Sequence, residues 1–196
     1  MASFKDVLHR RLHRHACRVL RFARDTRGVV ALEFGLVVLP FLMLVFGVVA
    51  VGIFYFQVSS IENAAQQAAR DIRVGKVQQG SGAYAGLSTD AQRKTALLSA
   101  FCASAATLPS CTSRTAVIVQ SSTNFSGISK PSCSSGGTLV SNASTGFSAG
   151  ASSSVVLVTF CYSMSLLGLP IFGSRGGLSD GSYLVQASVA FRTEPY

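Results

Sequence analysis

The three histidines of the chain, residues suited to binding metals and carrying protons near neutral pH, all lie close to its start. They are His9, His13 and His15, and no histidine follows. Sites that use histidine as a zinc ligand or general base are therefore excluded from most of the chain. We also find no nucleophile with an activating base beside it in the sequence. The sequence predicts a protein that is not an enzyme and that uses no cofactor, metal or small-molecule substrate.

Glu33 is the most informative ionisable residue, because it stands alone at the head of an apolar run. The 23 residues from Phe34 to Phe56 are all uncharged. As a helix they would reach about 34 Å at 1.5 Å per residue, which is enough to cross a bilayer. A carboxylate at mid-membrane costs about 2.5–3.5 kcal/mol on insertion scales, so Glu33 needs a compensating partner unless it lies among headgroups near Arg27.

A basic leader precedes this run and orients it. Residues 1–27 hold eight of the 17 Lys and Arg of the chain but only two acidic residues, whereas the net charge of the whole chain is +9. Flanking positive charge stays on the cytoplasmic side, so the sequence predicts a single membrane span with a cytoplasmic N-terminus and an exported C-terminal domain. Pro40 should kink the helix. A cleaved secretory signal, with its cut near Ala64–Ala69, is the alternative, but the apolar run is too long for one.

Four of the five cysteines lie in the part predicted to be exported: Cys102, Cys111, Cys133 and Cys161. An even number in an oxidising compartment predicts two disulfides. Three pairings exist and the sequence alone does not choose among them. We favour Cys102 with Cys111, which would clip a helix to the next turn, and Cys133 with Cys161, which would pin a loop to a strand. Zinc is disfavoured, since the spacings are not CxxC and no exported histidine exists.

The remaining elements follow from periodicity and turn residues. The helix should continue over residues 57–79 with an apolar, alanine-rich stripe, and a second helix near 89–107 begins with a capping box at Thr89. Three strands are expected over 115–120, 154–162 and 183–192, and a flexible Ser/Gly-rich loop over 121–154, with a short edge strand near 138–140. We expect an α+β, pilin-like fold in which the long N-terminal helix packs on a mostly antiparallel sheet of three or four strands.

The run Arg27-Gly28-Val29-Val30-Ala31-Leu32-Glu33-Phe34 resembles a type IV prepilin processing site. More specifically, the chain is similar to the TadE/TadG group of the tight-adherence (Flp pilus) system. Three features carry this resemblance: the segment from Arg27 to Pro40, the segment Glu62 to Arg70 that ends in Ala-Ala-Arg, and the last six residues, Phe191 to Tyr196. The length favours a TadE- or TadF-sized protein over the larger TadG.

The resemblance implies a minor pilin or pseudopilin of pilus biogenesis and adhesion, held in the bacterial inner membrane with its C-terminal domain in the periplasm. A prepilin peptidase would cut after Gly28, remove the leader 1–28 and expose an amine at Val29. Glu33, followed by the aromatic Phe34, would pair with that amine of a neighbouring subunit. The implied domains are the span 29–56, its continuation 57–79 and the exported domain 80–196. The implied partners are the membrane, the peptidase, other pilins or pseudopilins and Tad inner-membrane assembly proteins.

The sequence allows two other interpretations. Nucleic-acid binding by the leader is disfavoured, because the arginines stop where the apolar run begins. The main alternative is an uncleaved, membrane-anchored periplasmic protein with a binding or structural role, which would keep residues 1–28.

Overall fold

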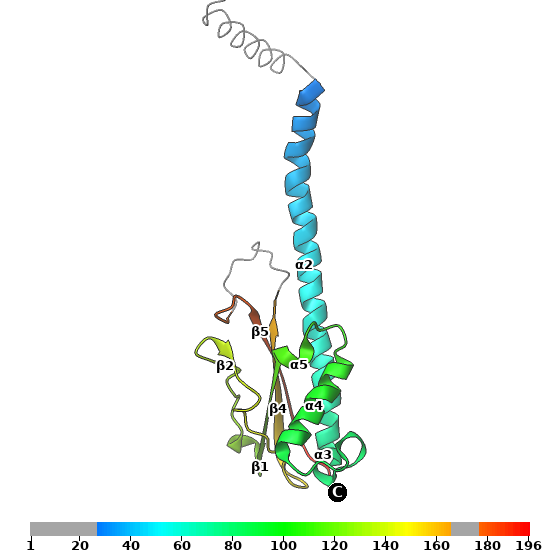
Figure 1. Cartoon of the computed structure of the whole chain (residues 1–196), viewed down its shortest axis with the longest axis vertical. Coiled ribbons are helices and arrows are strands. Elements are labelled where there is room, and N and C mark those ends of the chain that lie inside the picture. Colours follow the sequence, from blue (N-terminus) through cyan, green and yellow to red (C-terminus); the bar gives the residue numbers. More distant parts are fainter. Residues whose placement is uncertain (1–26, 166–176) are drawn as a thin grey trace, which may run out of the picture. The chain divides into compact units, whose positions relative to one another are not determined.

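The computed structural model describes residues 27–165 and 177–196 (Figure 1). Residues 1–26 of the leader and the segment 166–176 lie outside the described residues. The chain divides into two compact units, residues 1–49 and 50–196. One helix, α2 (Arg27–Arg73), has residues in both units.

In the first unit, every described residue belongs to α2, as expected for a span that satisfies its backbone hydrogen bonds internally. The helix assignment continues through Pro40. The large apolar side chains of this stretch, from Val29 to Val49, are exposed except for Val38, which is half-buried. An exposed apolar surface of this length fits a membrane anchor, and α2 is long and apolar enough to cross a bilayer.

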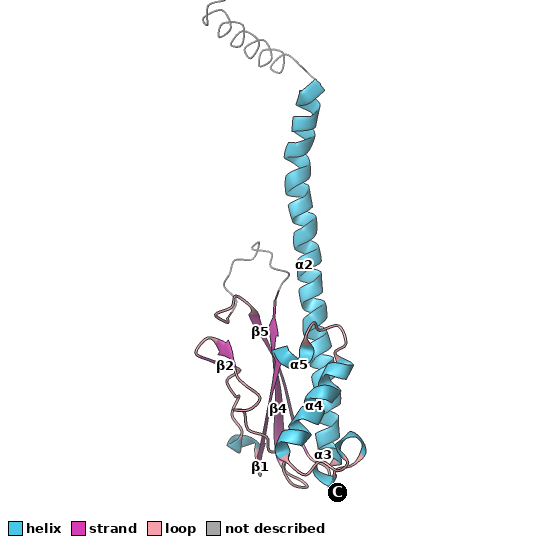
Figure 2. Ribbon diagram, in the orientation of Figure 1, coloured by secondary structure: helices cyan, strands magenta, loops and turns pink. Residues whose placement is uncertain are grey.

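The second unit is α+β, as predicted, and its elements are shown by type in Figure 2. Its sheet has the order β1-β4-β5, with both pairs antiparallel. The strands are β1 (Thr115–Ser122), β4 (Val155–Met164) and β5 (Tyr183–Arg192). A separate two-stranded sheet joins β2 (Ser134–Ser135) to β3 (Thr138–Leu139). The expected strand near 138–140 is therefore present, but it pairs with β2 and is not an edge of the main sheet.

The helices of this unit pack on one face of the sheet. The predicted stripe of α2 faces the core: Ile61, Ala65, Ala68 and Ile72 are buried, and Val58 is partly buried. Alanine side chains are short, so they allow the helix to approach the sheet closely. The second helix, α4 (Asp90–Ser104), begins with the predicted capping box between Thr89 and Gln92. Phe101 of α4 stacks on Phe160 of β4 with ring centroids 4.2 Å apart.

The continuation of the helix is shorter than predicted. α2 ends at Arg73, and a separate short helix, α3 (Lys76–Gln79), follows it. Gly75 lies between them with φ of 79°, a left-handed conformation that glycine adopts without steric cost. The next turns contain η1 (Gly82–Tyr84), and α5 (Cys111–Arg114) precedes β1. The apolar periodicity of the sequence continues past Arg73, so it does not predict the end of α2. Gly75 is the one sequence feature that could have indicated this end.

The Ser/Gly-rich segment is not the simple flexible connection that its composition suggested. It contains η2 (Phe125–Gly127) as well as β2 and β3, and it packs on the second face of the sheet. Cys133 of this segment is buried with Cys161, Ala116 and Ile118. The strand β4 is consequently buried along its whole length, because helices cover one face and this segment covers the other.

Candidate processing and assembly site

The residues of the expected cleavage site lie at the beginning of α2. Gly28 and Val29 are exposed, as are Glu33 and Phe34 one turn later. A Cβ atom placed on Gly28 would meet nothing within 4 Å, and the backbone is helical there. Neither packing nor a special φ in the described structure requires glycine at this position.

Glu33 is the only charged residue from Gly28 to Ile61. Its carboxylate makes no hydrogen bond or ion pair with any described residue. An unpaired carboxylate on an otherwise apolar helix surface is costly in a membrane, and no described residue of the chain compensates this charge. Any partner of this carboxylate must therefore lie outside the described residues of this chain.

The other end of α2 is held by the last residues of the chain. The backbone N–H of Glu194 donates to the carbonyl oxygen of Arg73 at 2.9 Å, and the Arg73 guanidinium lies 3.4 Å from the Glu194 carboxylate. Thr193 is buried, and its hydroxyl donates to the carbonyl oxygen of Ala151. The last residues of the chain thus fasten β5 to α2 and to the loop before β4. Its role in the described structure is packing.

Asp71 is neutralised within the domain. Its carboxylate lies 3.0 Å from the Lys76 ammonium and accepts a hydrogen bond from the buried Tyr84 hydroxyl at 3.3 Å. Burial, together with this neighbouring negative charge, raises the pKa of Tyr84 far above its usual value of 10. The phenol therefore stays protonated in the folded protein and continues to donate to Asp71.

The four later cysteines form two disulfides, Cys102–Cys111 and Cys133–Cys161. This is the pairing that we favoured over the two others. The first bridge joins α4 to α5, and the second joins the Ser/Gly-rich segment to the central strand. With these thiols oxidised, no group of three or more His, Cys, Asp or Glu side chains in the described residues could hold a metal ion.

The sequence analysis missed a buried cluster that attaches the Ser/Gly-rich segment to the core. Lys94 of α4 is buried, and its ammonium donates to the carbonyl oxygens of Asn142 and Thr145 and to the Thr145 hydroxyl. Burial lowers the pKa of Lys94. The helical stripe that contains Leu97 and Phe101 also contains position 94, so the apolar periodicity of α4 could have identified Lys94 as a buried lysine.

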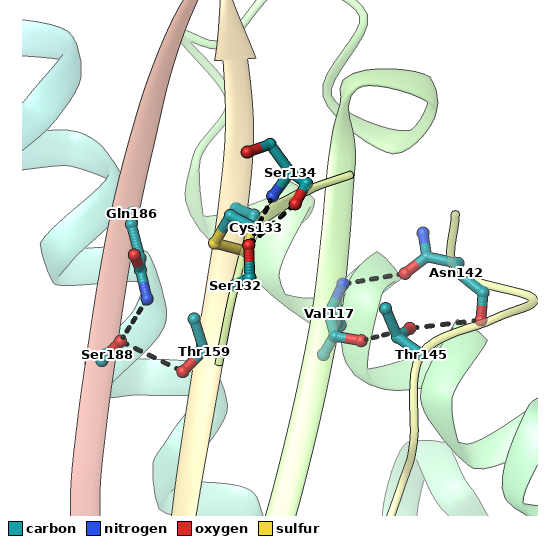
Figure 3. The surroundings of a disulfide bond; sticks show 10 residues. Val117, Ser132, Cys133, Ser134, Asn142, Thr145, Thr159, Gln186 and Ser188 are labelled. Carbon is teal, nitrogen blue, oxygen red and sulfur yellow. Dashed lines mark hydrogen bonds between the residues drawn. A yellow bond between two sulfur atoms is a disulfide. The ribbon is translucent and has the colours of Figure 1, made fainter. Parts of the chain in front are cut away.

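Asn142 completes this attachment at the outer edge of β1. Its amide oxygen accepts from the backbone N–H of Val117 at 2.8 Å (Figure 3). Its amide nitrogen donates to the carbonyl oxygen of Thr115. Further along, Val119 exchanges backbone hydrogen bonds with Gly146 and Ser148. Asn142 stands in an Asn-x-Ser sequon, but its side-chain amide makes hydrogen bonds to the β1 backbone of the kind that a neighbouring strand would make.

The turn before β5 contains one Gly-x-Ser-x-Gly spacing, Gly177 to Gly181, which the sequence analysis overlooked. The nucleophile motif with this spacing requires a strand, a sharp turn and then a helix. Here the turn leads into β5, and the hydroxyl and N–H of Ser182 donate to the Asp180 carboxylate. No histidine lies in the part of the chain that the structure describes, so this turn lacks the base that such a serine needs.

Comparison with known families identifies the N-terminal segment. The family described as TadE-like protein matches residues 28–70, from the glycine of the expected cleavage site to the Arg of Ala-Ala-Arg. No curated protein and no solved structure matches the chain. The matched segment includes the apolar stretch of α2 and the alanine stripe that packs on the sheet. Residues 28–70 are therefore similar to the TadE-like family, and this likeness points to a pilin-like component associated with the Tad pilus.

Proposed function

We propose that the protein is a minor pilin or pseudopilin of the Tad/Flp pilus, acting in pilus biogenesis and adhesion, and that a prepilin peptidase processes it after Gly28. The observation that carries this proposal is Glu33, a single unpaired carboxylate on the exposed apolar stretch of a TadE-like helix. Cleavage would place a new amine four residues before it, at Val29. Two charges that are each costly in an apolar environment compensate one another when paired.

The topology supports this mechanism. The basic leader keeps the N-terminus in the cytoplasm, where the peptidase acts, and the disulfide-bonded domain lies in the oxidising periplasm. Removing residues 1–28 takes away six of the nine net positive charges. To enter a filament, the helix must be drawn out of the membrane, and its N-terminus must pass into the bilayer. Charged residues make this passage costly, so removal of the leader lowers the cost.

The decisive measurement is the intact mass or N-terminal sequence of the protein extracted from membranes. A mature chain that starts at Val29 is expected, and a chain that keeps residues 1–28 would support the uncleaved periplasmic anchor instead. Gly28→Leu is the test variant and should retain the leader. Gly35→Leu is the matched control, because a Cβ at Gly35 also meets nothing within 4 Å in the described structure. Loss of the leader in the Gly28→Leu protein would overturn the proposed site.

A further inference from the structure

The outward face of α2 in the second unit carries two opposite charges that the domain leaves unpaired. Of the four charged residues between Ile61 and Arg73, Asp71 pairs with Lys76 and Arg73 pairs with Glu194. Glu62 and Arg70 are exposed and make no ion pair or hydrogen bond with the side chain of any described residue. The unpaired charges are therefore one acid and one base on the same helix.

These two residues cannot satisfy one another within one chain. They are eight residues apart, which at 1.5 Å per residue is about 12 Å along the helix axis. Favourable pairs on one helix are three or four residues apart. The side chains between them on this face, Asn63, Gln66 and Gln67, are uncharged and exposed.

The surface beside Arg70 is hollow on both sides. One groove, of about 620 Å³, lies between α2 and β5 and is lined by Arg70, Ala69 and Phe191 among others. A second groove, of about 610 Å³, lies between α2 and α4 and is lined by Arg70, Ala68 and Ala100 among others. Ridges of side chains on one helix pack into grooves beside another, and small residues let the helices approach.

We propose that a second copy of this chain docks on this face, parallel to the first and displaced by about 12 Å along α2, so that its Glu62 pairs with Arg70. Charge complementarity identifies the partner as a second copy, because this face carries both an unpaired acid, Glu62, and an unpaired base, Arg70. This inference rests on the proposed function, in which all copies enter the membrane from the same side and their helices run in the same direction. The contact is head to tail, so it can repeat along a row of copies.

Cysteine cross-linking of the full-length protein in cells that assemble pili tests this arrangement, because a copy displaced by about 12 Å along α2 is partly withdrawn from the bilayer. With the proposed displacement, position 59 of one copy is level with position 67 of the other, one turn before the charge pair. Ser59 and Gln67 are both exposed. Two differently tagged copies, one with Ser59→Cys and the other with Gln67→Cys, both in a Cys17→Ser background, should form a disulfide on mild oxidation. Two Ser59→Cys copies, and a Gln67→Cys copy with a Ser188→Cys copy, serve as matched controls and should cross-link far less.

Charge reversal makes the test specific. Arg70→Glu or Glu62→Arg in both copies should lower the 59–67 cross-linked fraction about fivefold, the size of a favourable exposed ion pair, and combining the two reversals should restore it. Equal cross-linking in the controls, no rescue by the double reversal, or an adduct with a different protein would overturn the inference. If the chain is cleaved after Gly28 but the 59–67 cross-link does not form, only the proposed contact is contradicted. If the chain keeps its leader but the 59–67 cross-link forms, the proposed function is contradicted and the contact is not.

Discussion

The ammonium group of Lys94 lies 2.8 Å from the carbonyl oxygen of Thr145. This contact joins a helix on one side of the sheet to the Ser/Gly-rich segment that passes along the edge of β1. Hydrogen bonds from a charged donor are stronger than neutral ones, and here the donor is buried. Lys94 therefore fixes a segment whose composition alone offers little apolar surface for packing.

Replacing Lys94 should loosen this segment. Lys94→Met keeps much of the side-chain volume but leaves the carbonyl oxygens of Asn142 and Thr145 without this donor. We expect the free energy of unfolding to fall by about 2–3 kcal/mol, measured by urea denaturation of the full-length protein in detergent. Lys130→Met is the matched control, because Lys130 is exposed, and it should change stability by less than about 0.5 kcal/mol. Equal effects of the two variants would contradict the role of Lys94.

The two disulfides should differ in their contribution to stability. The Cys133–Cys161 bridge spans 28 residues and the Cys102–Cys111 bridge spans nine. By loop entropy, replacing both cysteines of a bridge with serine should cost about 3.6 kcal/mol for the first and about 2.6 kcal/mol for the second. Denaturation of each double variant measures this order. A larger loss from removing the Cys102–Cys111 bridge would show that chain entropy does not dominate.

Gly75 should resist substitution for two separable reasons. Its φ of 79° is unfavourable for other residues, and a Cβ there would lie 2.5 Å from Cδ1 of Tyr196. Gly75→Ala should lower the free energy of unfolding by more than the roughly 1–2 kcal/mol of the left-handed backbone alone. In a Tyr196→Ala background, the cost of Gly75→Ala should fall to that backbone contribution. An unchanged cost in that background would exclude the clash with the tyrosine ring.

Stability should decrease at alkaline pH because of Tyr84. Burial raises its pKa above the unfolded value of 10, so the folded state keeps a proton that the unfolded state releases. Above about pH 10 the unfolded state therefore binds fewer protons, and the free energy of unfolding falls as the pH rises. Tyr84→Phe should flatten this slope in denaturation curves recorded from pH 8 to about 11. An unchanged slope in the Tyr84→Phe protein would contradict this role of Tyr84.

Glu33 should matter for assembly and not for insertion. Glu33→Ala removes the one charge of the apolar stretch, so membrane insertion should be retained or improved. Pilus formation, assayed by sheared filaments and by surface adhesion, should be strongly reduced. Leu32→Ala is a neighbouring control at an exposed position and should assemble. Normal pili with Glu33→Ala would contradict pairing between Glu33 and the Val29 amine.

Local sequence signals determined much of this protein. The uncharged run after Glu33, the capping box at Thr89 and the strand patterns depend on neighbouring residues, and the structure has a helix or strand at each of these places. The TadE-like segment was also recognisable from the sequence, because its motif is contiguous. The preferred cysteine pairing followed from the expected order of helix, turn, loop and strand.

Features that depend on contacts between residues far apart in the sequence became clear only in the tertiary structure. The hydrogen bonds of Lys94 and Asn142 join residues at least 25 positions apart, so composition favoured a flexible loop where the chain packs on the sheet. The end of α2 at Arg73 depends on Gly75 and on Glu194 and Tyr196 from the far end of the chain. Likewise, the sequence gives Glu62 and Arg70 as ordinary surface charges. That both lack a partner became visible only when the fold paired Asp71 with Lys76 and Arg73 with Glu194.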